Sequence, residues 1–161
     1  MTIDPIGPLC QCGNLGCLEA LASGPSIARE AVRLLKQGVP SMLASLVQND
    51  LTQIDGQLVV QAARAGDQLA SQVFSRAAFY LGVGVVNILH LFNPEIVIIG
   101  GGVSNAGDLL FGPVRDLVAQ RTMEAVRRGV SIVPAALGDD TGLLGAAALA
   151  RSGDPTGVQR T

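Results

Sequence analysis

The sequence lacks a surplus of basic residues. Its 161 residues include 11 basic and 13 acidic side chains, which give a formal net charge of −2. The basic residues are ten Arg and one Lys, and only Arg127 and Arg128 are adjacent. Proteins that bind nucleic acid through its phosphates concentrate Lys and Arg in one stripe or patch. The scattered pattern therefore argues against nucleic acid as a partner of this chain.

Long hydrophobic runs are lacking as well. The longest apolar stretch, residues 77–92, is interrupted by glycines, Asn87 and His90. It falls short of the ~20 residues that a membrane-spanning helix requires, so we expect a buried core helix and no membrane partner. Residues 1–5 show no basic region followed by an apolar run, which is the pattern of a secretory signal. The sequence therefore predicts a cytoplasmic protein.

The length and the apolar content limit the domain organisation. A chain of 161 residues has the size of one domain, which excludes a multidomain machine. Apolar residues make up 48% of the chain, enough to form a buried core, so wholesale disorder is excluded.

Hydrophobic periodicity predicts a mainly helical chain with two short strands. Residues 1–24 are expected to form a loop, and Ser23 and Asp67 are expected to cap the first and the longest helix. The predicted helices cover residues 25–38, a short piece within 39–54, 57–65, 68–92, about 106–127 and 141–151, and the predicted strands cover 96–99 and 131–134. We expect the tail, residues 152–161, to be disordered.

The order of these elements predicts an α/β fold with a parallel pair of strands. Residues 96–99 are β-branched and bounded by proline and glycine, which is typical of a strand buried on both faces. Two strands form too small a sheet for this number of helices. We therefore expect the sheet to be incomplete in this chain.

The three cysteines lie within eight positions, as Cys10, Cys12 and Cys17. Thiolates are good zinc ligands, and the glycines between the cysteines allow the backbone to turn so that the sulfurs converge. A reactive thiol or plain buried cysteines are the alternatives. Three ligands do not complete a structural zinc site, and His90, the only histidine, is more typical of a hydrogen-bonded core residue than of a fourth ligand.

Three segments match the landmarks of a known family, in the same order. They are Cys10-x-Cys12-Gly13-x-x-Gly16-Cys17-x-Glu19 with Ala22-Ser23-Gly24, then residues 93–102, and then Gly138-Asp139-Asp140 before residues 142–147. In these segments the chain resembles the ROK family of repressors and sugar kinases, over residues 1–150. Residues 21–25 are most similar to the bacterial glucokinase branch of that family.

The resemblance implies an actin-like (ribonuclease H-like) ATPase fold of two lobes, about twice as long as this chain. Members of that family carry an Asp-x-Gly-x-Thr phosphate loop, an Asn-Asp pair that supplies the catalytic base and a Glu-x-Gly-His segment, and we expect all three motifs to be absent here. By the family spacing, the histidine that supplies the fourth zinc ligand would fall just before Met1. We therefore expect this chain to represent the C-terminal lobe without the catalytic Asp.

The resemblance also assigns roles to individual residues. It implies that Cys10, Cys12 and Cys17 bind structural zinc and that Glu19 binds sugar hydroxyls, so that residues 1–24 form a zinc-binding and sugar-contact loop. It implies that Gly100, Gly101 and Gly102 approach the adenosine of ATP, within a lobe that spans residues 25–151. On sequence alone, Glu19 could instead be a charge near a helix start, and the glycines only a turn.

The function that the resemblance implies is ATP-dependent phosphorylation of a hexose, with Mg²⁺, zinc, ATP and the hexose as cofactors and partners. The alternative is the sugar-sensing lobe of a ROK transcriptional repressor, and a non-catalytic remnant is a third possibility. We expect the chain alone to be inactive. We also expect it to self-associate or form a homodimer, because an incomplete sheet leaves an open edge and an uncovered apolar face.

Overall fold

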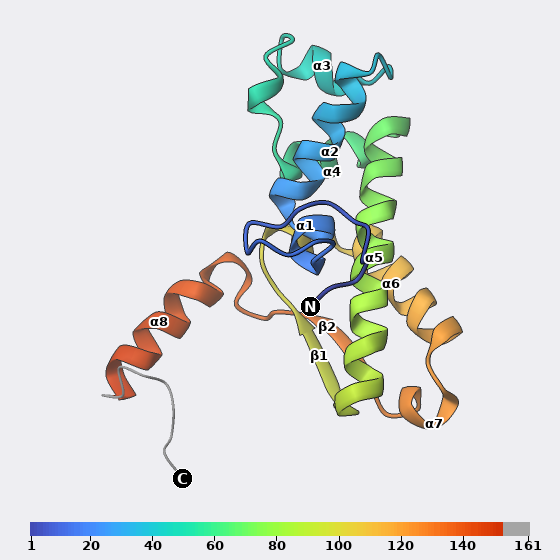
Figure 1. Ribbon diagram of the computed structural model, residues 1–161. Helices are drawn as coiled ribbons and strands as arrows, with labels where there is room; N and C mark the ends of the chain where they lie inside the picture. Colours follow the sequence, from blue (N-terminus) through green and yellow to red (C-terminus); the bar gives the residue numbers. More distant parts are fainter. Residues whose placement is uncertain (153–161) are drawn as a thin grey trace.

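The computed structural model describes residues 1–152. Its elements follow one another in the order α1 (Leu18–Ala22), α2 (Gly24–Lys36), α3 (Met42–Leu46), η1 (Leu51–Gln53), α4 (Gly56–Arg64), α5 (Gln68–Phe92), β1 (Ile96–Ile99), η2 (Gly102–Ala106), α6 (Asp108–Arg121), α7 (Glu124–Arg127), β2 (Ser131–Pro134), η3 (Gly138–Asp140) and α8 (Thr141–Ser152), where η denotes a 3-10 helix. The mainly helical α/β fold is confirmed (Figure 1). Except for Ser152, which ends α8, the tail predicted to be disordered lies outside the described residues.

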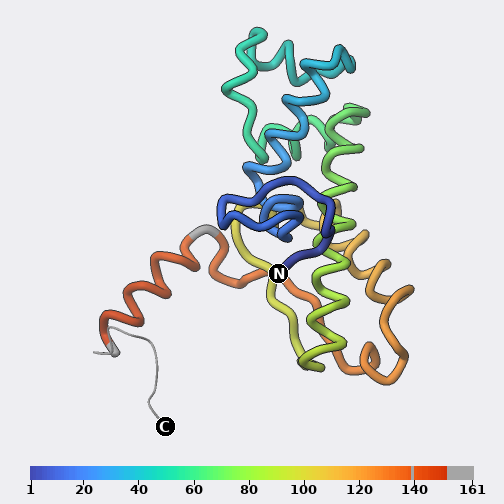
Figure 2. Tube along the Cα trace, in the orientation of Figure 1, coloured from blue at the N-terminus to red at the C-terminus, as the bar shows by residue number. Residues whose placement is uncertain are grey.

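The long helix α5 organises the core. Asp67 caps it as predicted, because its carboxylate accepts a hydrogen bond from the Ala70 N–H at 2.8 Å. Helices α1, α2, α4 and α6 all pack against α5, and Figure 2 shows its trace running along most of the molecule. Leu69 and Leu89, near the two ends of the helix, are 1% and 0% exposed. Burial of such side chains contributes about 1.5–3 kcal/mol each, so the buried face of α5 stabilises the fold.

By length and composition alone, α5 could also cross a membrane. Its most apolar stretch is half buried against the rest of the structure. The side of α5 that faces the other helices is buried, as in the core helix that the sequence predicts, whereas Leu91 and Phe92 at its end are exposed.

Helices α2 and α4 begin side by side. Ser23 caps α2 as predicted, since its hydroxyl accepts from the Ser26 N–H, and Asp55 caps α4 in the same way. A Cβ on Gly56 would lie 2.9 Å from the Gly24 Cα, so only glycine permits this approach. The prediction of a loop over residues 1–24 is wrong at its end, where a five-residue helix, α1, forms and packs on α5.

The two strands form a parallel pair, with Ile96 opposite Ser131 and Ile99 opposite Pro134. Strand β1 is not buried on both faces as predicted. Its inward residues pack against the core, but Ile96 and Ile98 are 50% and 62% exposed. Within residues 1–152 the sheet consists of this one pair of strands. The helices cover only one of its faces, so the outer face is open.

The predicted helix over residues 106–127 is divided into two helices, α6 and α7, which follow η2. Gly107 has a φ of +62° and separates η2 from α6, and the extended backbone of Thr122 separates α6 from α7. Helix α8 follows the last strand and extends away from the other helices (Figures 1 and 2). All of its side chains that the structure describes are exposed.

Candidate functional site

The sulfur atoms of Cys10, Cys12 and Cys17 lie within 4.8 Å of one another. Cys10 and Cys17 are buried, Cys12 is exposed, and all three are free thiols. The Cys12 and Cys17 sulfurs are 3.6 Å apart. Zn–S bonds of about 2.3 Å in a tetrahedron put two sulfurs about 3.8 Å apart, so this spacing fits three of the four zinc ligands.

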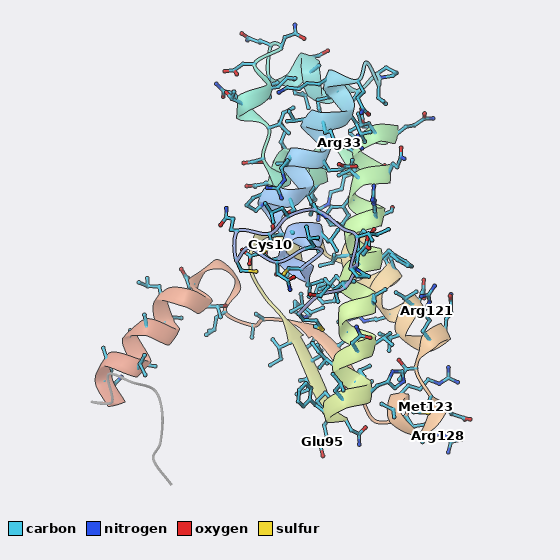
Figure 3. The ribbon with its side chains drawn as sticks, in the orientation of Figure 1. Cys10, Arg33, Glu95, Arg121, Met123 and Arg128 are labelled. Atoms are coloured by element: carbon cyan, nitrogen blue, oxygen red, sulfur yellow. The ribbon has the colours of Figure 1, made fainter. Side chains whose placement is uncertain are left out.

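The backbone of the N-terminal loop holds the three thiols together. Figure 3 shows this loop with Cys10 labelled. The Cys10 N–H donates to the Asn14 carbonyl, and the Gly13 N–H donates back to the Cys10 carbonyl. Isolated β-bridges join Thr2 to Cys17 and Leu9 to Leu15. The loop is therefore a folded, hydrogen-bonded unit.

The cysteines differ in acidity. A hydrogen bond with the Asn14 backbone lowers the pKa of the Cys12 thiol, and contacts with Cys17 and Cys10 lower it further. The contact with Cys12, together with burial, raises the pKa of Cys17 to about 11. Cys12 is therefore the first of the pair to ionise.

Glu19 lies two residues after Cys17, in the first turn of α1, and its side chain is exposed. Its backbone is fixed, because its carbonyl accepts from the Ser26 hydroxyl at 2.8 Å and from the Ser23 N–H. The carboxylate is thus displayed to solvent from a fixed point beside the cysteine cluster. This position suits an acceptor of hydroxyl hydrogen bonds.

His90 is not a core residue, in contrast to the prediction. It is exposed near the end of α5, and its Nε2 accepts from the Met123 N–H at 3.4 Å. Among residues 1–152, the group that could hold a metal ion contains only the three cysteines. His90 is therefore not the fourth ligand in this arrangement.

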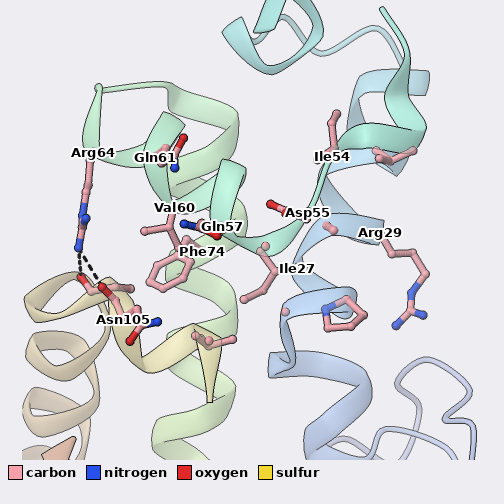
Figure 4. A pocket seen from close by; sticks show the side chains of 18 residues that line it. Ile27, Arg29, Ile54, Asp55, Gln57, Val60, Gln61, Arg64, Phe74 and Asn105 are labelled. Atoms are coloured by element: carbon pink, nitrogen blue, oxygen red, sulfur yellow. Dashed lines mark hydrogen bonds between the residues drawn. The ribbon is translucent and has the colours of Figure 1, made fainter. Parts of the chain in front are cut away.

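A cleft of about 870 Å³ opens between α2, α4, α5 and η2. Of the three glycines after β1, only Gly102 lines it; Gly101 turns the chain with a φ of +83°, and a Cβ on Gly100 would contact Ala135. Ile27, Val60 and Phe74 give the cleft an apolar interior (Figure 4). A strand that leads through glycines to the wall of a cleft allows a ligand to approach the backbone closely.

Sequence reasoning missed the walls of this cleft that α2 and α4 supply. The available signal was the recurrence of a cap residue followed by glycine, as Ser23-Gly24 and Asp55-Gly56, which are the two glycines in contact. The expectation that the chain lacks an Asn-Asp pair is wrong, because Asn49-Asp50 is such a pair. The carboxylate of Asp50 caps η1 through Thr52 and Gln53. Neither member of that pair lines the cleft.

Known proteins resemble this chain in sequence and in fold. The glucokinase of Thermotoga maritima is 40% identical over 152 residues, covering 92% of this chain and 47% of that protein. The xylose repressor of Caldicellulosiruptor bescii is 34% identical over 148 residues, covering 92% of this chain and 37% of the repressor. A crystal structure of a ROK family glucokinase from Streptomyces griseus with glucose and AMPPNP superimposes with a TM-score of 0.82 at 34% identity, covering 94% of this chain and 50% of that one.

The chain thus spans half or less of the length of these relatives. The sequence model of the ROK family matches residues 1–152, which is the whole of the described chain. The sequence landmarks, the fold and these relatives agree. The chain belongs to the ROK family and is glucokinase-like.

Proposed function

We propose that this chain is the C-terminal lobe of an ATP-dependent hexose kinase of the ROK family, acting in the cytoplasm. In this proposal it supplies one side of the nucleotide site, a zinc-binding loop and a sugar ligand. The observation that carries the proposal is the cleft between α2, α4 and η2. It has an apolar interior, glycine at its wall and a volume of about 870 Å³ that accommodates a nucleoside.

The likeness to the Streptomyces griseus glucokinase supports this assignment, because that protein was crystallised with glucose and AMPPNP. In our proposal the adenosine of ATP lies in the cleft, near Gly102. The apolar side chains of Val60 and Phe74 exclude water from the base. The γ-phosphate then extends from the cleft toward the hexose.

The cysteine loop has a supporting role in this proposal. Cys10, Cys12 and Cys17 would hold zinc, which supplies a structural link and takes no part in the chemistry. Because Glu19 follows Cys17 by two residues, fixing the loop also fixes the Glu19 carboxylate, which then accepts hydrogen bonds from hexose hydroxyls. The base that deprotonates the 6-hydroxyl is assigned to a part of the family fold that this chain does not match.

The repressor matches support a second candidate, the sugar-sensing lobe of a ROK regulator. Such a lobe needs Glu19 and the cysteine loop, but its task requires no bound nucleotide. Nucleotide binding therefore distinguishes the two candidates. The higher identity to the glucokinase, 40% against 34%, favours the kinase.

The test is calorimetric titration of the chain with AMPPNP and the same titration of two matched glycine variants. A Cβ at Gly102 or at Gly112 would meet no atom within 4 Å, but only Gly102 lines the cleft. We expect saturable binding by the native chain and by Gly112→Leu, and at least tenfold weaker binding by Gly102→Leu. Absence of binding to the native chain, or equal weakening by both variants, would contradict the proposal.

A further inference from the structure

Arg64 forms a link across one end of the cleft. It lies in the last turn of α4, and its Nη2 donates to the carbonyl oxygens of Asn105 and Ala106, each at 3.1 Å (Figure 4). Those carbonyls belong to η2 on the opposite wall. The sequence separation is about 40 residues, so the link is a tertiary contact and not part of either helix.

The carbonyls that Arg64 binds are at the C-terminal end of η2, where a helix leaves carbonyl groups without partners of its own. Near the other end of η2, the Ser104 hydroxyl donates to the Gly101 carbonyl at 2.7 Å. The short helix is thus tied at one end to the glycine turn and at the other end to α4. A hydrogen bond from a charged donor is stronger than a neutral one, so the Arg64 link is the firmer of the two.

The Arg64 link joins the two walls between which the proposed ligand would lie. Val60, Gln61 and Arg64 follow one another along the α4 wall, whereas Val103, Asn105 and Ala106 form the η2 wall. Phe74 lies between the two walls. A flat aromatic base gains most when both walls contact its faces, so the separation of the walls determines its affinity.

We propose that Arg64 is a positioning residue that sets the separation of α4 and η2 and thereby the affinity for the adenosine part of a nucleotide. The inference rests on the proposed nucleotide site. Arg64 acts here through the backbone of η2 and makes no contact with the phosphates. Its loss therefore weakens binding of adenosine and of ATP by the same factor.

The experiment compares adenosine and ATP binding by calorimetry, well below the melting temperature, in the native chain, Arg64→Gln and Arg64→Lys. Loss of hydrogen bonds from a charged donor is expected to weaken both ligands about tenfold in Arg64→Gln. Lysine keeps a donor but not the planar fork, so Arg64→Lys should fall between the two. Arg121→Gln is the matched control, because Arg121 also ends a helix, stacks on Phe79 and lies outside the cleft.

Three results would overturn the inference. If Arg64→Gln and Arg64→Lys bind adenosine as tightly as the native chain, the hydrogen bonds of Arg64 do not determine the separation of the cleft walls, although the proposed function stands. If ATP weakens much more than adenosine, Arg64 contacts the phosphates instead. If the native chain binds neither ligand, the proposed function fails and the inference fails with it. If Arg64→Gln does not fold, the affinities of Arg64→Lys for adenosine and for ATP, each divided by that of the native chain, provide the test.

Discussion

Gly16 is the residue on which the geometry of the cysteine loop most depends. Its φ is +58°, and a Cβ there would lie 1.5 Å from the Asp4 carbonyl oxygen. The Gly16 carbonyl also accepts from the N–H groups of Ile3 and Asp4. The N-terminal segment is therefore in direct backbone contact with the residue before Cys17, and no side chain can be accommodated between them.

We predict that Gly16→Ala disrupts the cysteine loop and that Gly13→Ala does not. Gly13 also has a positive φ, +86°, but a Cβ there would meet no atom within 4 Å. Gly13→Ala should cost about 1 kcal/mol of backbone strain and keep its zinc. Gly16→Ala should lose zinc, measured by elemental analysis after purification without chelator. Equal zinc content in the two variants would contradict this explanation.

At the scale of elements, Asp67 connects two helices. Its carboxylate caps α5 through the Ala70 N–H and also accepts from the Ser41 hydroxyl and the Met42 N–H at the start of α3. Burial alone would raise the pKa of Asp67, but these hydrogen bonds together hold it below its usual value. The folded state therefore favours the ionised carboxylate.

Replacing Asp67 by Ala should lower the free energy of unfolding by about 1–2 kcal/mol near neutral pH. Because the pKa is lower in the folded state, this contribution is present above the unfolded value of 3.8 and is lost as the pH falls through the folded value. The difference in the free energy of unfolding between the native chain and Asp67→Ala should thus shrink below about pH 4. Denaturant unfolding at several pH values measures this difference in the free energy of unfolding. Asp116→Ala, at an exposed position in α6, is the control. A difference that does not vary with pH would contradict the role of the Asp67 charge.

The sequence predicted the elements that have strong local signals. Strands β1 and β2 have the predicted bounds, and the caps Ser23 and Asp67 were identified, because β-branched runs and cap residues act locally. The breaks at Gly107 and Thr122 were missed, since an isolated glycine or threonine within a helical pattern does not by itself end a helix. The exposure of Ile98 contradicts the interpretation of residues 96–99 as a strand buried on both faces, but it agrees with the expectation that an incomplete sheet leaves an apolar face uncovered.

The candidate site was predictable to a similar extent. The convergence of Cys10, Cys12 and Cys17 follows from their spacing and glycines, and the structure brings them together. The cleft was identified only at Gly102. Its other walls come from α2 and α4, far away in the sequence, and their approach depends on the contact of Gly24 with Gly56, which is a tertiary property.

At the scale of the whole molecule, the open face of the sheet is the main feature. Ile96 and Ile98 project from β1 away from the core, and helix α8 exposes Leu143 and Leu144. Apolar patches and open strand edges favour pairing with other chains. The described chain therefore presents a surface suited to association.

We predict self-association of the chain at tens of micromolar, measured by light scattering. Ile98→Thr should reduce it, whereas Met123→Thr, at a similarly exposed site on the chain segment beside α7, should not. A native chain that is monodisperse and monomeric and unfolds cooperatively on heating would show that the open face of the sheet does not drive association.

We also predict that the purified chain phosphorylates no hexose. The sequence contains no Asp-x-Gly-x-Thr phosphate loop, and its Asn49-Asp50 pair serves as the cap of η1. Loss of a general base alone costs about 10²–10⁴-fold in rate. ATP-dependent and hexose-dependent turnover in a coupled assay, in proportion to the amount of chain, would contradict this prediction.

The most direct test of the central claim, that the cleft is a nucleotide site, is amide chemical-shift mapping of the ¹⁵N-labelled chain during titration with adenosine. The account predicts saturable shifts at residues that line the cleft, including Gly56, Gly102 and Val103, with little change at Gly13 in the cysteine loop. Shifts that are absent, or that cluster on the cysteine loop or the outer face of β1, would contradict it.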